Sequence, residues 1–272
     1  MKIFKYLLLI IVIAILYSCN QKPSKIDDNK SIISNKESFI IGKWLRMGHN
    51  GPISLIFKEN GTVDSYLDNN NLIDVLSDFS IINDTIKFYD KQGKTCPEVG
   101  VYKIHKTDYY IAFDLIDDNC NGRVKSTMGF WIRPNFEHLI KELDSTINAS
   151  NDIENLLNRA RIYMALGKSE MARNDFDTYI QNDTTNARVF MNRAATKFPN
   201  DFAGAIVDCN KSIAIDPNNK SAYFLRGIAL FETGEKEKAC DDLYKAIELG
   251  FSILKEAEKE RCNEFWDNYD KN

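Results

Sequence analysis

Residues 158–176 read NRARIYMALGKSEMARNDF, and parts of this stretch recur twice further along the chain. A triplet of the form Asn-Arg-Ala or Leu-Arg-Gly begins at 158, 192 and 225, at intervals of 34 and 33 residues. An Asp preceded by an Ala three residues earlier recurs in step, at 172–175, 205–208 and 239–242. A unit of about 34 residues that is present three times predicts stacked helix–turn–helix repeats, because one such unit cannot bury its apolar face alone.

The repeated residues resemble the tetratricopeptide repeat. Small residues stand where the paired helices of that family touch, glycines stand at the turns, large apolar residues fill one helix position, and a proline closes the second repeat. In the same order, these residues are Ala160, Ala194 and Gly227; Gly167 and Gly234; Phe176 and Leu243; and Pro217. The resemblance implies an all-α solenoid over 136–272, with a leading amphipathic helix at 136–150 and a polar capping helix at 252–266.

In this family the first helix of every repeat lines a concave groove that holds peptides. Carried over position by position, the groove residues are Leu157, Arg161, Met164, Arg188, Met191, Phe224, Ile228 and Phe231. This surface is apolar with two arginines near one end, which favours a peptide with apolar anchors and a carboxylate. The alternative is that several of these side chains belong to the core.

One Arg and one Asp recur in every repeat, 16, 15 and 16 residues apart. The pairs are Arg159 with Asp175, Arg193 with Asp208 and Arg226 with Asp242. We expect an ion pair between the two helices of each repeat, partly exposed and therefore of little weight for stability. The alternative is an anion site formed by the three arginines.

Residues 38–135 have a different pattern, with apolar residues at every second position and turn residues every 8–12 positions. They predict strands at 38–47, 52–58, 62–67, 77–83, 85–90, 99–105, 109–116 and 124–133. Eight short consecutive strands favour a small up-and-down antiparallel barrel, because closure removes exposed edges.

Gly42-Lys43-Trp44 on the first strand resembles the G-x-W signature of the lipocalin superfamily. Arg133, at the end of the last strand, matches the late Arg that packs over this Trp in the family. The resemblance implies that Trp44 and Arg133 close one end of the barrel through a cation–π contact. The domain is short for the superfamily, so a barrel filled by side chains and a barrel with a small-molecule site both fit.

The N-terminus has the pattern of an export signal. Lys2 and Lys5 precede an apolar run over 6–17, too short to span a bilayer. Residues 16–19, Leu-Tyr-Ser-Cys, resemble the lipobox of bacterial lipoproteins. That resemblance implies removal of residues 1–18, acylation of Cys19 with fatty acids such as palmitate, and a flexible tether over 19–37. Asn20 favours the outer membrane of the cell envelope. The alternative is an ordinary signal peptide with an incidental Cys.

The other cysteines fit an oxidising compartment. Cys96 and Cys120 fall in turns at the same end of the predicted barrel, which predicts a disulfide. Cys240 and Cys262 flank Gly250 at similar distances on two antiparallel helices, which predicts a second disulfide. Cys209 is left as a buried thiol. Because the sequence has no Cys or His pair at ligand spacing, we expect no metal site.

The composition limits the function. The chain is 44% apolar with a net charge of -4, which excludes wholesale disorder and argues against a nucleic-acid partner. Three histidines lie on separate predicted elements and belong to no recognised catalytic or cofactor motif, so we expect neither an enzyme nor a bound cofactor. Two functions remain: a lipid-anchored scaffold that binds a protein or peptide in the repeat groove, or a carrier of a small apolar ligand in the barrel with the repeats as docking module.

Overall fold

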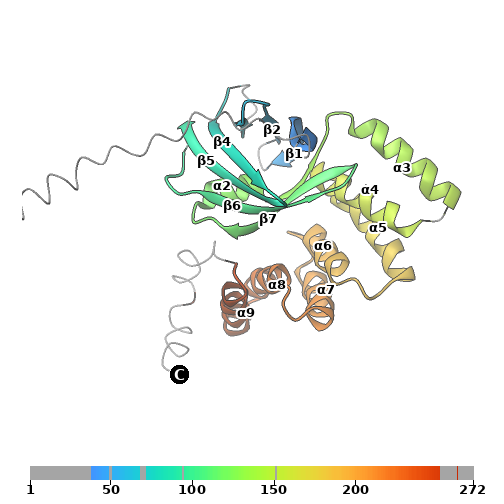
Figure 1. Cartoon of the computed structure of the whole chain (residues 1–272). Helices are drawn as coiled ribbons and strands as arrows, with labels where there is room; N and C mark the ends of the chain where they lie inside the picture. The colour runs from blue at the N-terminus through green and yellow to red at the C-terminus, as the bar shows by residue number, and fades with distance from the viewer. Residues whose placement is uncertain are drawn as a thin grey trace, which may run out of the picture.

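The computed structural model describes residues 38–48, 51–67, 72–93, 95–150, 152–251 and 262. It places a β-barrel against a curved row of helices (Figure 1). The predicted signal segment, Cys19 and the tether lie outside the described residues, as does the predicted capping helix except for Cys262. Within the described ranges, no helix has both the length and the hydrophobicity needed to cross a membrane.

Eight strands form a closed barrel in which each strand pairs antiparallel with the next, and β8 returns to pair with β1. Their bounds are β1 Gly42–Gly48, β2 Gly51–Phe57, β3 Thr62–Tyr66, β4 Val75–Ile82, β5 Thr85–Gly93, β6 Gly100–Lys106, β7 Tyr110–Asp117 and β8 Gly129–Ile132. This topology confirms the predicted up-and-down barrel.

Two predicted strands are wrong at their starts, over 38–40 and 124–127, where the chain is helical. A 3-10 turn, η1 (Ser38–Ile40), precedes β1, and helix α2 (Asn121–Thr127) precedes β8. In α2 the buried residues are Arg123, Val124 and Thr127. They share one helical face through the i,i+3 and i,i+4 spacings, whereas a strand would turn Val124 and Thr127 to opposite faces.

Side chains fill the barrel interior. Phe57, Phe79, Phe88, Tyr102 and Phe113 are all buried, and neighbouring rings meet at centroid separations of 5.0–6.5 Å, mostly edge to face. Such ring pairs are a favourable packing of aromatic side chains. Of the two interiors that the sequence allowed, the structure has the packed one.

Each of the two helical turns covers one end of the barrel. The segments 42–46 (GKWLR) and 129–133 (GFWIR) repeat one pattern, Gly-x-Trp-x-Arg. The indole N–H of Trp44 donates to the carbonyl of Ile40 in η1, and that of Trp131 donates to the carbonyl of Thr127 in α2, both at 2.7 Å. Because β1 and β8 are antiparallel neighbours, η1 and α2 lie at opposite ends, so both ends are covered.

The two segments exchange their arginines. The guanidinium of Arg133 lies 3.8 Å from the ring centroid of Trp44, which is the predicted contact, and that of Arg46 lies 5.4 Å from the ring centroid of Trp131. The first residue of each segment is a glycine with φ +106°, and a Cβ there would come within 2.8 Å of the opposite guanidinium. The positive φ therefore favours glycine at both positions, and a Cβ there would also displace the guanidinium group.

The helices follow the predicted repeat. They are α3 Phe136–Ser150, α4 Ile153–Ala165, α5 Ser169–Asn182, α6 Ala187–Lys197, α7 Phe202–Ile215, α8 Lys220–Glu232 and α9 Lys236–Glu248. Three antiparallel pairs result, α4 with α5, α6 with α7 and α8 with α9. Ala160 and Ala194 are fully buried, and a Cβ on Gly227 would lie 2.9 Å from Leu243 across the third pair. The small residues thus let the paired helices approach closely.

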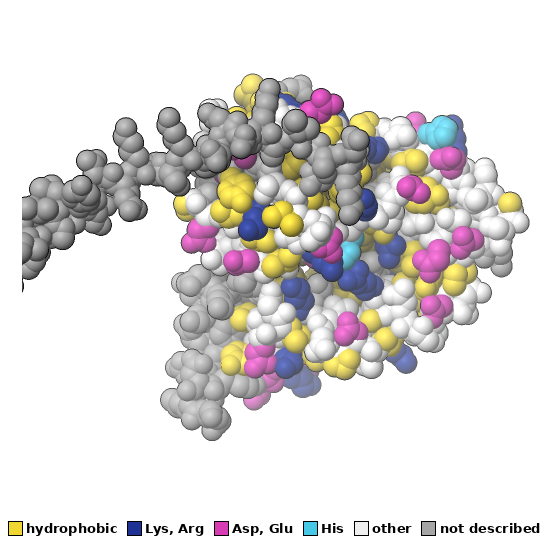
Figure 2. Space-filling model, viewed as in Figure 1, with side chains coloured by type: hydrophobic (Ala, Val, Ile, Leu, Met, Phe, Trp, Pro, Cys, Tyr) yellow, Lys and Arg dark blue, Asp and Glu magenta, His cyan; other side chains and the backbone are white. Residues whose placement is uncertain are grey.

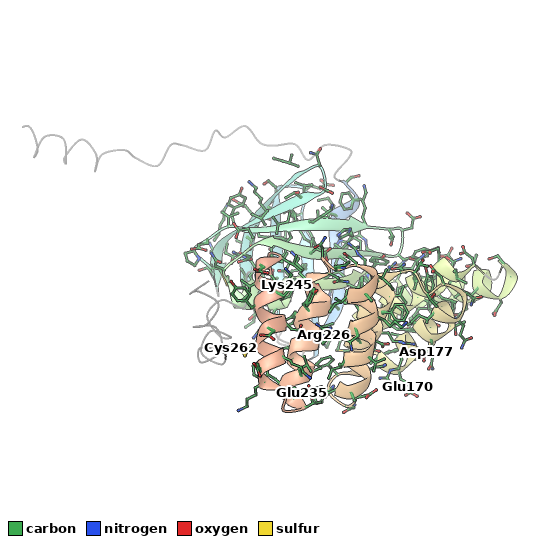
Figure 3. All side chains as sticks on the ribbon, turned by 90° about the horizontal axis from the view of Figure 1, so that it is seen from below. Glu170, Asp177, Arg226, Glu235, Lys245 and Cys262 are labelled. Atoms are coloured by element: carbon green, nitrogen blue, oxygen red, sulfur yellow. A yellow bond between two sulfur atoms is a disulfide. The ribbon has the colours of Figure 1, made fainter. Side chains whose placement is uncertain are left out.

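The repeated Arg–Asp pairs form as predicted, but at buried positions. Each arginine donates two hydrogen bonds to the Asp of its own repeat, the shorter ones at 2.5–2.6 Å, and the Asp side chains are only 1–8% exposed. The Nη1 of each arginine also reaches the preceding helix, at Asp144, Asp177 and Asn210. We call the three arginines, their Asp partners and their contacts on the preceding helix the arginine ladder. Figure 3 labels two of its members, Arg226 and Asp177. The predicted partial exposure is wrong for the carboxylates, and the alternative anion site is excluded because these guanidinium groups are already paired.

Both predicted disulfides are present, with Cα–Cα separations of 6.0 Å for Cys96–Cys120 and 5.6 Å for Cys240–Cys262. Cys209 is a buried free thiol, and burial raises its pKa to about 12.

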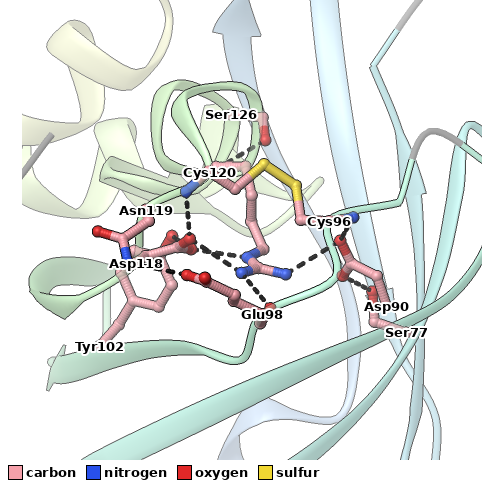
Figure 4. Close-up of a disulfide and its surroundings, with 10 residues drawn as sticks. Ser77, Asp90, Cys96, Glu98, Tyr102, Asp118, Asn119, Cys120 and Ser126 are labelled. Atoms are coloured by element: carbon pink, nitrogen blue, oxygen red, sulfur yellow. Dashed lines mark hydrogen bonds and ion pairs between the residues drawn. A yellow bond between two sulfur atoms is a disulfide. The ribbon is translucent and has the colours of Figure 1, made fainter. Parts of the chain in front are cut away.

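The barrel disulfide lies beside a buried ionic network (Figure 4). Arg123 pairs with Asp118 at 2.6 Å and with Asp90 at 3.0 Å, and Tyr102 donates to the same Asp118. The disulfide and the network together join α2 to the strand ends.

Candidate functional site

The barrel packs directly against the first helices of the solenoid. Tyr110 and Ile132 of the barrel share one apolar cluster with Leu143 of α3 and with Ile162 and Ala165 of α4. All five side chains are at most 5% exposed, so this junction is an interior contact. The face that the family resemblance assigns to peptide binding is therefore partly covered by the protein's own barrel.

Beyond this junction a cavity of about 600 Å³ opens between the barrel and the repeats. The barrel wall includes Arg46, His105, Asp114, Met128 and Phe130, and the helical wall includes Arg161, Met164, Arg188, Met191 and Lys220. Figure 2 shows Lys and Arg side chains gathered where the two halves of the molecule meet. We call this space the junction cavity.

Four of the predicted groove residues line the junction cavity, namely Arg161, Met164, Arg188 and Met191. They come from α4 and α6, the first helices of the first and second pairs. Half of the eight residues that the resemblance assigned to the groove thus lie at this cavity.

The other four groove residues lie elsewhere. Leu157 is 1% exposed in the core cluster of α4 and α5, so its assignment to a ligand-binding surface is wrong. Phe224, Ile228 and Phe231 are half-buried and pack against the cluster of α9 and the second disulfide. Phe224 stacks on Phe251 with ring centroids 4.7 Å apart. The last turn of the solenoid uses these residues for packing.

The cations of the junction cavity are held mainly by neutral groups. Arg161 donates to the hydroxyl of Tyr110 at 2.8 Å, Lys220 donates to the carbonyl of Leu115 at 3.0 Å, and Arg46 donates to the carbonyl of Lys125 at 3.2 Å. Burial lowers the pKa of Arg46 to about 10 and also lowers the pKa of Lys220. These shifts indicate cations that are removed from water without full electrostatic compensation.

Asp114 is the carboxylate of β7 at this cavity. Its Oδ2 atom lies 2.8 Å from Nε2 of His105, which is hydrogen-bonding distance, and 3.9 Å from Nη2 of Arg188. Its side chain is 51% exposed. Asp114 therefore offsets part of the positive charge at one side of the cavity. Among the described residues, no group of three or more His, Cys, Asp or Glu side chains is arranged to hold a metal ion.

Sequence reasoning missed the barrel wall of the cavity. Arg46, His105 and Asp114 face the repeats only because the barrel docks on α4, and no local pattern encodes that docking. Arg46 alone carried a readable signal, because it ends the first of the two Gly-x-Trp-x-Arg segments.

Comparisons with known proteins agree with the repeat architecture. Family models of the tetratricopeptide repeat match residues 153–186 and 209–241. No curated protein matches this chain. Among solved structures, a MamA protein is 22% identical, with a TM-score of 0.42 over 50% of this chain and 86% of its own.

Two further solved structures are similar over the helices. The first tetratricopeptide repeat domain of Spaghetti (RPAP3), bound to the HSP90 peptide SRMEEVD, is 28% identical, with a TM-score of 0.38 over 43% of this chain and 90% of its own. The Arabidopsis OM64 tetratricopeptide repeat domain is 27% identical, with a TM-score of 0.39 over 41% and 95%. The family matches and the helix pairs together show that this chain contains tetratricopeptide repeats, which follow an eight-stranded antiparallel barrel in the sequence.

Proposed function

We propose that the protein is a non-enzymatic, membrane-anchored scaffold that binds a segment of a partner protein in the junction cavity. The observation that carries this proposal is the position of four predicted groove residues, which line the junction cavity from the side of the repeats: Arg161, Met164, Arg188 and Met191. Family models of the tetratricopeptide repeat match residues 153–186, which include Arg161 and Met164, and residues 209–241.

The cavity has the size and the chemistry of a binding site for a short peptide segment. A volume of about 600 Å³ lies within the range of protein ligand sites. Met164 and Met191 contribute flexible apolar side chains, which adapt to the shape of an apolar anchor. Phe130 adds an aromatic wall on the barrel side.

The packed barrel argues against carriage of a small apolar ligand. Aromatic rings occupy its interior, and η1 and α2 cover its two ends. A ligand would have to displace both the rings and one of the tryptophan contacts to enter.

The proposed place of action is the bacterial outer membrane, with Cys19 acylated and residues 20–37 as tether. This part rests on the lipobox resemblance of residues 16–19. Labelled palmitate should enter the wild-type protein in bacterial cells and not the Cys19→Ser variant, and equal labelling of both would refute the anchor.

The binding function is tested by cross-linking and recovery of the full-length protein from envelope membranes. We expect Met164→Glu combined with Met191→Glu to lose the partner, since two carboxylates would enter an apolar part of the wall. Val207→Glu is the matched control, because Val207 is 59% exposed on α7. Circular dichroism checks that all variants fold. Equal recovery of the partner by folded M164E/M191E and by wild type would refute this site.

A further inference from the structure

We propose that the segment received by the junction cavity is acidic, and that Arg46 of the barrel and Arg161 and Lys220 of the repeats bind its carboxylates. This inference rests on the proposed function and names the chemistry of the partner. It also gives the barrel a part in recognition, because one of the three cations lies on β1.

The first argument is the contrast between two sets of cations in the same molecule. Each arginine of the ladder donates two hydrogen bonds to one buried carboxylate. Arg46, Arg161 and Lys220 donate instead to carbonyls and one hydroxyl, and none has an ion-pair partner within the part of the chain that the structure describes. An arginine or lysine side chain that lines the cavity and has no carboxylate partner retains donors for a ligand, and it gains most from an anionic one.

The second argument comes from the two Gly-x-Trp-x-Arg segments. Arg133 stacks on Trp44 and donates to two backbone carbonyls, of Ile41 and Phe39, at 2.8 and 2.7 Å. Arg46 stacks at the longer distance of 5.4 Å on Trp131 and donates to a single carbonyl at 3.2 Å. Arg133 thus makes two hydrogen bonds and a close stacking contact within the barrel, whereas its counterpart Arg46 makes one hydrogen bond at a longer distance and lines the junction cavity.

The third argument concerns Asp114, which is one of two aspartates, with Asp216, that line the cavity. Asp114 lies between His105 and Arg188 and also interacts electrostatically with Lys220. It shows that this wall accepts a carboxylate. It also lowers the positive potential that an acidic ligand meets, so removing its charge should strengthen binding.

The occupant that fits best is an extended peptide. The cations are spread over β1, α4 and α8, with Met128 on the barrel wall and Met164 on the helical wall. A single small anion reaches only one end of such a site, whereas a peptide with alternating acidic and apolar side chains contacts both kinds of group.

The test is titration calorimetry of the full-length protein in detergent with a capped synthetic peptide of three Glu-Leu repeats. Its counterpart with Gln in place of Glu controls for the apolar contacts, and free phosphate and succinate test for a small-anion site. We expect the Glu peptide to bind at least about tenfold more tightly than the Gln peptide, since hydrogen bonds between charged groups are the stronger ones. Arg46→Gln and Arg161→Gln should each weaken its binding about tenfold, with no change in Lys211→Gln, which alters an exposed lysine of α7.

Asp114→Asn should tighten binding of the Glu peptide severalfold, a gain that misfolding cannot produce. The inference is overturned if the Gln peptide binds as tightly as the Glu peptide, if neither arginine variant weakens binding, if Asp114→Asn fails to tighten it, or if phosphate or succinate binds as tightly as the Glu peptide. In any of these cases, loss of the cellular partner in M164E/M191E would still support the proposed function. Conversely, tight Glu-peptide binding with equal recovery of partner by wild type and M164E/M191E would refute only the proposed function.

Discussion

Replacing Asp208 with Ala tests whether the arginine ladder stabilises the solenoid. The Asp208 side chain is 1% exposed and accepts hydrogen bonds from Arg193 at 2.9 and 2.5 Å. It also forms an ion pair with Lys197 at 2.9 Å. Its loss leaves two cations that are only 19% and 14% exposed. Removing one partner of a buried ion pair costs about 3–5 kcal/mol. Arg193 keeps its contact with Asp177, so we expect the lower end, about 3 kcal/mol.

Asp177→Ala is the matched control, because Asp177 bonds the same arginine at 2.7 Å but is 47% exposed. Screening by water limits such a pair to about 0.2–1 kcal/mol. The two variants should therefore differ by at least about 2 kcal/mol in the free energy of unfolding, measured by urea denaturation with circular dichroism at 222 nm and an unchanged m-value. Equal losses in D208A and D177A, or a loss below about 1 kcal/mol in D208A, would refute the reasoning that burial sets the energetic weight of the ladder.

Three further predictions concern the barrel. Replacing both Cys96 and Cys120 by Ala should lower the free energy of unfolding by about 3 kcal/mol, as expected for a short closed loop, and a shift in the urea midpoint of tryptophan fluorescence measures this. Arg133→Met keeps much of the side-chain volume but loses the stacking on Trp44 and two hydrogen bonds, for a total of about 2–4 kcal/mol in the same assay. Burial, followed by a hydrogen bond to a carboxylate, raises the pKa of Tyr102, so the folded state holds this proton more tightly than the unfolded state. The resulting stability is complete below the ordinary tyrosine pKa of about 10 and is lost as pH rises above it, and Tyr102→Phe should flatten that loss in denaturation series at rising pH.

The sequence predicted features that local residues determine. The repeat period, the order of the strands and both disulfides follow from residue spacing and were found in the structure. The contact of Arg133 with Trp44, which the resemblance to the lipocalin superfamily implies, is also present. Helix α2 was missed because residues 121–127 contain a single large apolar residue, Val124, so that no helical period is visible in its sequence.

Features that depend on contacts between distant segments were not predictable in this way. The burial of Asp208 results from the stacking of three helix pairs. The residues next to it in the sequence are typical of a solenoid and do not indicate this burial. The burial of Leu157 was misassigned because the groove and core positions of a helix are separated by only one turn or less. Docking of the barrel on α4 depends on Tyr110, Ile132 and Ile162, which lie far apart in the chain and follow no common period.

The docked barrel changes the repeats from an open surface into a site with two walls. Because Tyr110 and Ile132 are buried against α4, separating the two halves would expose apolar side chains, and the walls are therefore held in a fixed relation. The two ends of the barrel are covered by equivalent tryptophan contacts, yet their arginines differ in their hydrogen bonds: Arg133 donates to two backbone carbonyls, and Arg46 donates to one at a longer distance. Although side chains fill the barrel interior, the outer surface of the barrel forms one wall of the junction cavity. It places Arg46 and Asp114 opposite Arg161 and Arg188 of the repeats.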